Sequence, residues 1–218
     1  TELVNYIDWT TFFSAWRLKG PYPKILEDEK YGEEAKKLYA DAQQLIQELI
    51  ESPIILNKAK VGFFPAHSIG DDIEVFAGDD IEKVCPQEHL HMLRSQRKMD
   101  EASSTNKCLA DYIAPKEIGN QDYIGAFVVT AGLELESILQ KYEKNEDDYT
   151  IIMIKAIADR FAEAFAEYMH EMVRKELWGY AITEDFSNHD LIREKFTGIR
   201  PAPGYASCPD HSEKQTLF

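Results

Sequence analysis

The chain has 218 residues, enough for one domain with a substantial core, and its hydrophobic fraction of 44% is ordinary for a globular protein. Its 39 acidic residues outnumber its 24 Lys and Arg residues, which gives a net charge of −15. Because nucleic acid and anionic membrane surfaces would repel such a chain, we expect neither as a partner.

The N-terminal part combines an aromatic-rich segment with a helix. Residues 1–28 are interrupted by Gly20, Pro21 and Pro23, which predicts a short helical turn and an ordered loop whose aromatic side chains pack on the core. Residues 30–51 form the first clear helix, because apolar residues recur at steps of three and four. This apolar face consists of Tyr31, Ala35, Leu38, Ala42, Leu45 and Leu49.

The middle of the chain has the patterns of strands. Alternating or β-branched residues predict strands at residues 59–66, 72–76, 81–85 and 123–131. A turn is expected over residues 67–71, between the first two strands. The pattern of residues 86–107 is ambiguous, and we expect this segment to cross over the sheet.

The second half of the chain is helical, with helices predicted at residues 134–144, 147–176 and 188–196. The apolar stripe of the long helix consists of Ile151, Ile154, Ala158, Phe161, Phe165, Tyr168 and Met172. Gly179 follows its end, where a left-handed cap is favourable, and residues 187–190 resemble a capping box. Because a helix is followed by antiparallel strands and then by helices, the order predicts an α+β fold rather than alternating βαβ units.

Motifs for catalysis or metal binding do not emerge from the sequence. No serine-hydrolase, P-loop or dinucleotide-binding string occurs. His170 and Glu171 begin a zinc-protease pattern, but Arg174 occupies the place of the second His and cannot ligate a cation. The spacing of the cysteines favours free thiols in a reducing cytoplasm over disulfides or zinc. These cysteines are Cys85, Cys108 and Cys208.

A row of polar residues on the long predicted helix has two interpretations. The row consists of Asp159, Glu163, Glu167 and His170, which share a face away from the apolar stripe. The row is either an ordinary solvated face or a set of carboxylates presented to a cationic ligand. The residue pattern favours the solvated face.

The tail contains a second candidate feature, the string RPAPGY at residues 200–205. Two prolines restrict its backbone, and Gly204 permits a close backbone approach. Arg200 can hold a carboxylate through two hydrogen bonds, and Tyr205 offers an aromatic face to a base or a cation. The set would suit an amino-acid nucleoside, although proline-rich loops often only pack.

The strings themselves resemble the activation domain of cobalamin-dependent methionine synthase. The matching strings cover essentially the whole chain in order: residues 6–10 (YIDWT), 22–28 (YPKILED), 64–66 (FPA), 70–74 (GDDIE), 108–112 (CLADY), 122–127 (DYIGAF), 158–167 (ADRFAEAFAE) and 198–205 (GIRPAPGY). The resemblance implies a C-shaped, single-domain α+β fold around a twisted antiparallel sheet flanked by helices.

The resemblance also implies a function. The chain would bind S-adenosylmethionine and support reductive methylation of inactive cob(II)alamin to methylcobalamin, as a methyltransferase component that does not complete a turnover alone. The corrinoid would come from a cobalamin-binding domain, because the chain has no D-x-H-x-x-G string. The electron would come from a flavodoxin-type donor. Since the nucleophile is the cofactor's cobalt, no catalytic residue and no metal site are expected in this chain.

Matching strings also imply roles for individual residues. Asp8 and Glu163 would contact the cationic amino-acid end of S-adenosylmethionine, and Arg200 would hold its carboxylate. The remaining expected contacts are Ala202 and Tyr205 along the adenosyl group, and Glu194 near the same pocket.

The chain departs from the family pattern in two respects that bear on function. Thr11 stands where the family usually has Pro, and family domains typically continue well beyond the position of Phe218. We therefore expect one domain over residues 1–218, with the C-terminal part of the family domain missing or reduced. The alternative is a module of the same fold that docks on a corrinoid protein without donating a methyl group.

Overall fold

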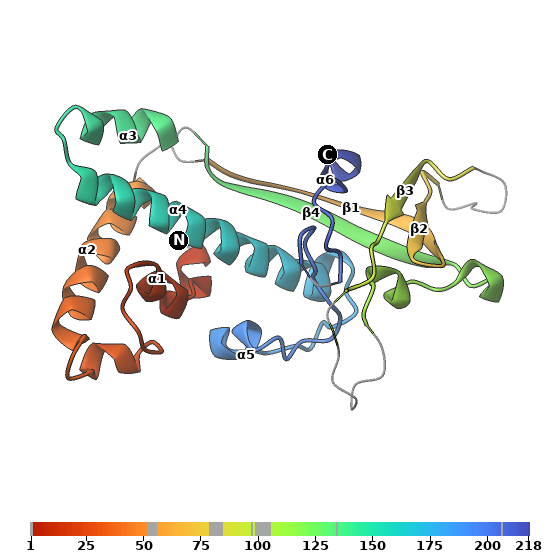
Figure 1. Cartoon of the computed structure of the whole chain (residues 1–218), viewed down its shortest axis with the longest axis horizontal. Coiled ribbons are helices and arrows are strands. Elements are labelled where there is room, and N and C mark those ends of the chain that lie inside the picture. Colours follow the sequence, from red (N-terminus) through yellow and green to blue (C-terminus); the bar gives the residue numbers. More distant parts are fainter. Residues whose placement is uncertain are drawn as a thin grey trace. The chain divides into compact units, whose positions relative to one another are not determined.

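The computed structural model describes residues 2–51, 56–78, 85–96, 98, 106–133, 135–205 and 207–218. The chain forms two compact units. The first comprises Thr1–Lys60 and Val128–Thr197, and the second comprises Val61–Phe127 and Gly198–Phe218. The chain passes from one unit to the other within the strands β1 (Leu56–Ile69) and β4 (Asp122–Leu133) and again between Thr197 and Gly198 (Figure 1).

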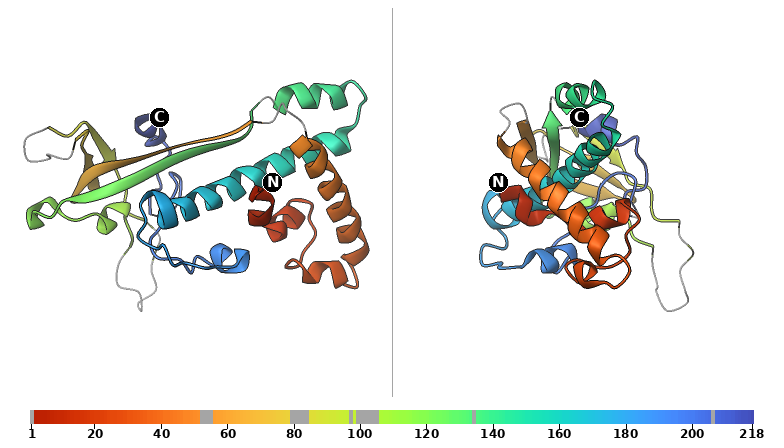
Figure 2. Two further views of the ribbon diagram at one scale, coloured as in Figure 1. Left: turned by 180° about the vertical axis from the view of Figure 1, so that it is seen from behind. Right: turned by 90° about the vertical axis from the view of Figure 1, so that its left-hand side faces the viewer.

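The first unit is mainly helical. Its helices are η1 (Glu2–Tyr6), α1 (Trp9–Ala15), η2 (Lys24–Glu27), α2 (Gly32–Glu51), α3 (Leu135–Glu143), α4 (Asp148–Met172), the π-helical turn η5 (Val173–Leu177) and α5 (Asn188–Ile192). Helix α1 packs beside α4, and α4 also contacts α2, α3 and η1 (Figures 1 and 2). No helix in the described part of the chain is long and apolar enough to cross a membrane.

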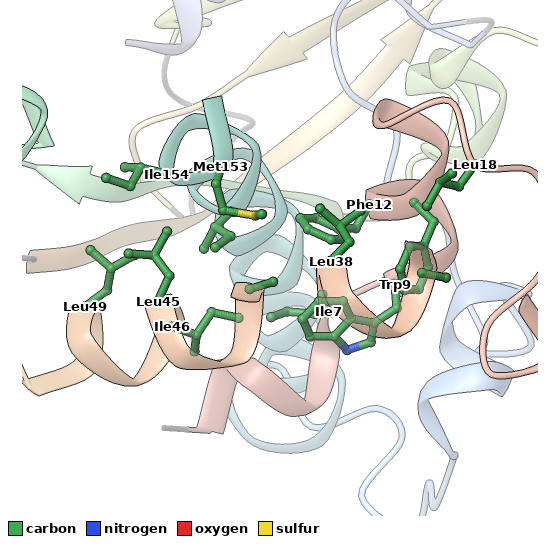
Figure 3. Packing of buried hydrophobic residues seen from close by; sticks show 14 of the residues in the cluster. Ile7, Trp9, Phe12, Leu18, Leu38, Leu45, Ile46, Leu49, Met153 and Ile154 are labelled. Carbon is green, nitrogen blue, oxygen red and sulfur yellow. The ribbon is translucent and has the colours of Figure 1, made fainter. Parts of the chain in front are cut away.

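The core of the first unit joins the N-terminal arm to α2 and α4. The predicted face of α2 is confirmed, because all its members except the half-buried Tyr31 are buried. Figure 3 shows Leu38, Leu45 and Leu49 of this face packed with Trp9 and Phe12 from α1 and with Met153 and Ile154 from α4. Full burial of each such side chain stabilises the fold by roughly 1.5–3 kcal/mol.

The predicted stripe of α4 is only partly correct. Ile154 and Phe165 are buried, but Ile151, Ala158 and Tyr168 are only half-buried. The buried face instead includes Met153, Ile157, Ala164 and Met169. The difference arises because α4 is covered on more than one side, so its apolar positions do not follow a single line.

The sheet has the order β3–β2–β1–β4, and the pairs β1–β2 and β2–β3 are antiparallel. Strand β2 covers Asp72–Val75 and β3 covers Glu88–His91. The prediction of an α+β fold with an antiparallel sheet is therefore confirmed.

The strands depart from the predicted bounds. Strand β1 continues through residues 67–69, because Ile69 pairs with Asp72, so the turn shrinks to Gly70 and Asp71. A strand also forms at Glu88–His91, within the segment whose pattern was ambiguous. Residues 81–84 lie outside the described residues, as do 97 and 99–105 of the ambiguous segment.

The second unit has a smaller core behind the sheet, and it contains two of the cysteines. Strand residues such as Ala66, Ile73 and Leu90 pack there with Cys108 and Cys208. Arg94 donates to Asp71 at 2.6 Å and to Asp111 at 2.7 Å, which ties the turn after β1 to η3. The helices of this unit are η3 (Leu109–Tyr112), η4 (Lys116–Ile118) and α6 (Lys214–Leu217).

The helix predicted over 188–196 is shorter than expected. Its capping box is confirmed, since Ser187 Oγ accepts from the Asp190 amide and Asp190 accepts from the Ser187 amide. The helix α5 ends at Ile192 because Glu194 takes a left-handed conformation with φ of 52°. The Lys195 amide then donates to the Asp190 carbonyl, the closing bond of a Schellman cap that usually requires Gly.

The N-terminal arm is fastened to α4 by polar contacts as well as by the core. Tyr6 Oη donates to Glu171 Oε2 at 2.8 Å, and its ring packs edge-on against Tyr168. Burial and the neighbouring Glu171 carboxylate raise the pKa of Tyr6 above its ordinary value. The neutral, donating hydroxyl is therefore the form that holds the arm.

We predict that Tyr6→Phe lowers the free energy of unfolding by about 1–2 kcal/mol, because it removes a hydrogen bond to a charged acceptor. Chemical denaturation measures the loss. Tyr112→Phe is the control, because it removes an exposed hydroxyl from η3. Equal stability of the two variants would show that the Tyr6 contact does not hold the arm.

Candidate functional site

Asp8, the first of the predicted contacts, is the N-cap of α1. Its Oδ1 atom accepts from the backbone amides of Thr10 at 2.9 Å and Thr11 at 3.3 Å, and Oδ2 accepts from the Thr11 hydroxyl. The departure from the family at Thr11 thus adds a donor to this carboxylate. Our sequence interpretation missed the cap, although an Asp directly before a short apolar helix is a typical capping signal.

The residues on either side of Asp8 are fixed by the core and by α5. Ile7 and Trp9 are buried, and Asn188 of α5 donates from Nδ2 to the Ile7 carbonyl at 3.4 Å. The Asp8 carboxylate is half-buried between these anchors. The position of the Asp8 carboxylate is therefore set by its N-cap role in α1 and by the contact of the neighbouring Ile7 with α5.

Glu163 lies exposed on α4, next to the buried Ala164. Ala164 belongs to the same core cluster as Ile7 and Trp9, the neighbours of Asp8. Within the first unit, the core thus brings the segments that carry Asp8 and Glu163 into one packed body. The convergence of the two carboxylates on one ligand stays a prediction.

The polar row predicted on α4 does not form one solvated face. Asp159 and Glu163 are exposed and Glu167 is half-buried, but His170 is only 4% exposed. The His170 ring packs edge-on against Phe196, with ring centroids 4.7 Å apart. The prediction is wrong for His170 because the segment after α4 folds back over the end of this helix, which periodicity alone does not reveal.

Glu194 is exposed immediately after α5. Its left-handed backbone is unfavourable for a residue with a Cβ atom, by roughly 1–2 kcal/mol. Strain of this kind is concentrated at functional sites, where the surrounding structure maintains it. The carboxylate of Glu194 is thus held at a defined turn.

Arg200, Ala202 and Tyr205 lie in the tail loop of the second unit. Arg200 is half-buried, Ala202 is exposed, and Tyr205 is 68% exposed. The loop is closed by hydrogen bonds from the Gly204 amide to the Cys208 carbonyl at 2.7 Å and from the Cys208 amide to the Tyr205 carbonyl at 3.0 Å. These bonds present the Tyr205 ring at the tip of a closed turn.

Gly204 is required by the loop itself. Its φ is 104°, and a Cβ atom at this position would overlap the imidazole ring of His211. The sequence predicted a close backbone approach of Gly204 to a ligand, which stays a prediction, and the structure places His211 against this glycine. Any larger residue would displace His211 or open the turn.

The base of the tail loop is anchored in the core of the second unit. Cys208 is buried in one cluster with Cys108, and the Leu109 amide donates to the Ser207 carbonyl at 2.8 Å. All three cysteines are free, and burial raises the pKa of the Cys108 and Cys208 thiols. Both thiols are therefore neutral and serve packing rather than nucleophilic chemistry.

The six predicted residues are divided between the two units. The first unit supplies the carboxylates of Asp8, Glu163 and Glu194, and the second supplies Arg200, Ala202 and Tyr205. Among the residues that the structure describes, no group of three or more His, Cys, Asp or Glu side chains could hold a metal ion.

An open pocket of the first unit, between α2 and the α3–α4 pair, contains none of these six residues. Its lining includes Asp41, Glu48, Tyr142 and Tyr149. Tyr149 Oη donates to Asp41 Oδ2 at 2.7 Å. The Asp41 carboxylate of this pocket therefore already has a hydrogen-bond donor within the protein.

Comparison with known proteins agrees with the sequence and the fold. The family model of the vitamin B12-dependent methionine synthase activation domain matches residues 1–218. A crystal structure of the MetH reactivation domain bound to AdoHcy is 51% identical, covers 99% of this chain and superposes with a TM-score of 0.91. The chain spans 65% of the length of that matched chain. We conclude that this chain belongs to the activation-domain family of vitamin B12-dependent methionine synthases.

Proposed function

We propose that the chain binds S-adenosylmethionine and supports the reactivation of a cobalamin-dependent methionine synthase. The observation that carries the proposal is the AdoHcy-bound reactivation domain, which is similar in sequence and structure across nearly the whole chain. AdoHcy is the product that remains when S-adenosylmethionine gives up its methyl group. A relative that holds this product favours methyl donation over the alternative of docking alone.

The reaction balances with one electron. Cob(II)alamin, one electron and S-adenosylmethionine give methylcobalamin and AdoHcy. The corrinoid is supplied by a cobalamin-binding domain, and we propose a flavodoxin-type protein as the electron donor and the cytoplasm as the location. The chain then contributes binding and orientation, so the reaction needs no nucleophile or general base from its side chains.

The proposed residues match the charges of the ligand. Arg200 would donate two parallel hydrogen bonds to the ligand carboxylate, and Ala202 and Tyr205 would line its adenosyl group. Asp8 and Glu163 would accept from its ammonium group, with Glu194 nearby. A carboxylate has about four lone-pair sites, and three donors already occupy Asp8, so Asp8 is suited to one ligand hydrogen bond.

We predict that Arg200→Ala weakens S-adenosylmethionine binding roughly 30- to 150-fold, because a charge-assisted bidentate contact contributes about 2–3 kcal/mol. Isothermal titration calorimetry measures the change. Arg17→Ala is the matched control, because Arg17 is exposed beyond α1. Unchanged affinity in Arg200→Ala would remove Arg200 from the site, whereas absence of binding in the parent chain would refute the proposed function.

We also predict that Asp8→Asn and Glu163→Gln weaken S-adenosylmethionine binding with little change in the stability of the ligand-free protein. Asn is as good an N-cap as Asp, whereas Asp8→Ala would remove the cap and cost about 1 kcal/mol of stability. If both carboxylates hold the same ammonium group, the double substitution is less than additive. Calorimetry and thermal denaturation of the four proteins test this, and full additivity would place the carboxylates at separate groups.

A further inference from the structure

Arg174 is a charged side chain in the interior of the first unit. It lies in η5, directly after α4, and its exposed fraction is 0%. Burial of a guanidinium carries a large desolvation penalty, and a buried ion pair is often no more stabilising than apolar residues of the same volume. Stability alone therefore gives a weak reason for an arginine at this position.

Among the described residues, three contacts of Arg174 reach the segment that follows it. Its Nε atom donates to Glu184 Oε2 at 2.7 Å, and its guanidinium carbon lies 4.3 Å from the centre of the Phe196 ring. Its carbonyl accepts from the Ala181 amide at 2.9 Å. One residue thus contacts the beginning of the segment 181–196, at Ala181 and Glu184, and its end, at Phe196.

The segment held by Arg174 carries two features of the candidate site. Glu194 lies two positions before Phe196, in its left-handed conformation. Asn188 donates to the carbonyl of Ile7, the residue before Asp8. The Phe196 ring also makes a T-shaped contact with His170, so it contacts two residues of the α4–η5 helix.

We propose that Arg174 is a positioning residue that holds the segment 181–196, and with it Glu194, in the conformation that binds ligand. This inference rests on the proposed function for its ligand, S-adenosylmethionine. Arg174 is fully buried and acts through Glu184 and Phe196 rather than by touching the ligand. The planar guanidinium can donate in its plane and stack on a ring with its face, which a lysine ammonium cannot reproduce.

The first test compares Arg174→Lys with Arg17→Lys, the same exchange at an exposed position of the same unit. Lysine keeps the charge opposite Glu184, so we expect the variant to fold. We expect S-adenosylmethionine affinity to fall about tenfold in Arg174→Lys and to stay unchanged in Arg17→Lys, by calorimetry on folded protein. If Arg174→Lys does not fold, Glu184→Gln removes the counter-charge with little change in shape and takes its place.

A double-mutant cycle with Glu194→Gln separates positioning from a general structural role. If Arg174 acts through Glu194, Arg174→Lys causes little further loss of affinity in the Glu194→Gln background. The same loss in both backgrounds, or no loss in either, overturns the inference.

Amide hydrogen exchange of the ligand-free protein supplies a readout that does not depend on ligand. We expect faster exchange over residues 188–196 in Arg174→Lys than in Arg17→Lys, with unchanged exchange in α2. A parent chain that fails to bind S-adenosylmethionine would refute the proposed function. The exchange data would still test whether Arg174 positions the segment 181–196. Unchanged exchange over residues 188–196 contradicts the positioning role.

Discussion

Burial of α4 against the N-terminal arm and against the segment that follows η5 is the interaction on which the first unit depends. The N-terminal arm packs on it through Trp9 and Phe12, and Tyr6 adds a hydrogen bond to Glu171. The segment after η5 folds back on the C-terminal end of the helix through Phe196, which contacts His170 and Arg174. Since none of these segments is adjacent to another in the sequence, α4 is the common surface that orders them.

The candidate ligand contacts are each held by a local structural device. Asp8 is fixed by its role as an N-cap, Glu194 by a left-handed turn, and the tail loop by hydrogen bonds that close on Cys208. Groups that are ordered before a ligand arrives lose less conformational entropy on binding. The same devices explain why Asp8→Asn and Asp8→Ala should differ, because only the alanine removes the cap.

The interior polar groups fit a domain that positions a ligand rather than one that performs chemistry with its own side chains. His170 is covered by an aromatic ring, and the buried thiols of Cys108 and Cys208 have raised pKa values. None of these groups is placed as an exposed, activated nucleophile or base. The proposed function, methyl transfer to a cobalt nucleophile, would require none, since binding geometry would supply the protein's share of the catalysis.

Local patterns in the sequence determined much of the secondary structure. The apolar face of α2, the capping box at Ser187 and the left-handed cap at Gly179 all follow from neighbouring residues, and all are present in the structure. The family strings likewise determined the fold class and the family, because they are properties of the linear chain.

Only the tertiary structure decided which face of α4 is buried, that His170 is covered, and that a strand forms at Glu88–His91. The physical reason is the same in each case. A hydrophobic pattern that repeats every 3.6 residues in a helix, or every two in a strand, predicts one buried face. A helix that is covered on several sides has more than one buried face, so the pattern does not identify them. A short strand is defined by its partner, as β3 is by β2, and that partner lies elsewhere in the sequence. Glu194 likewise adopts a conformation that its own residue type disfavours, and Phe196, two residues later, packs on His170 and Arg174.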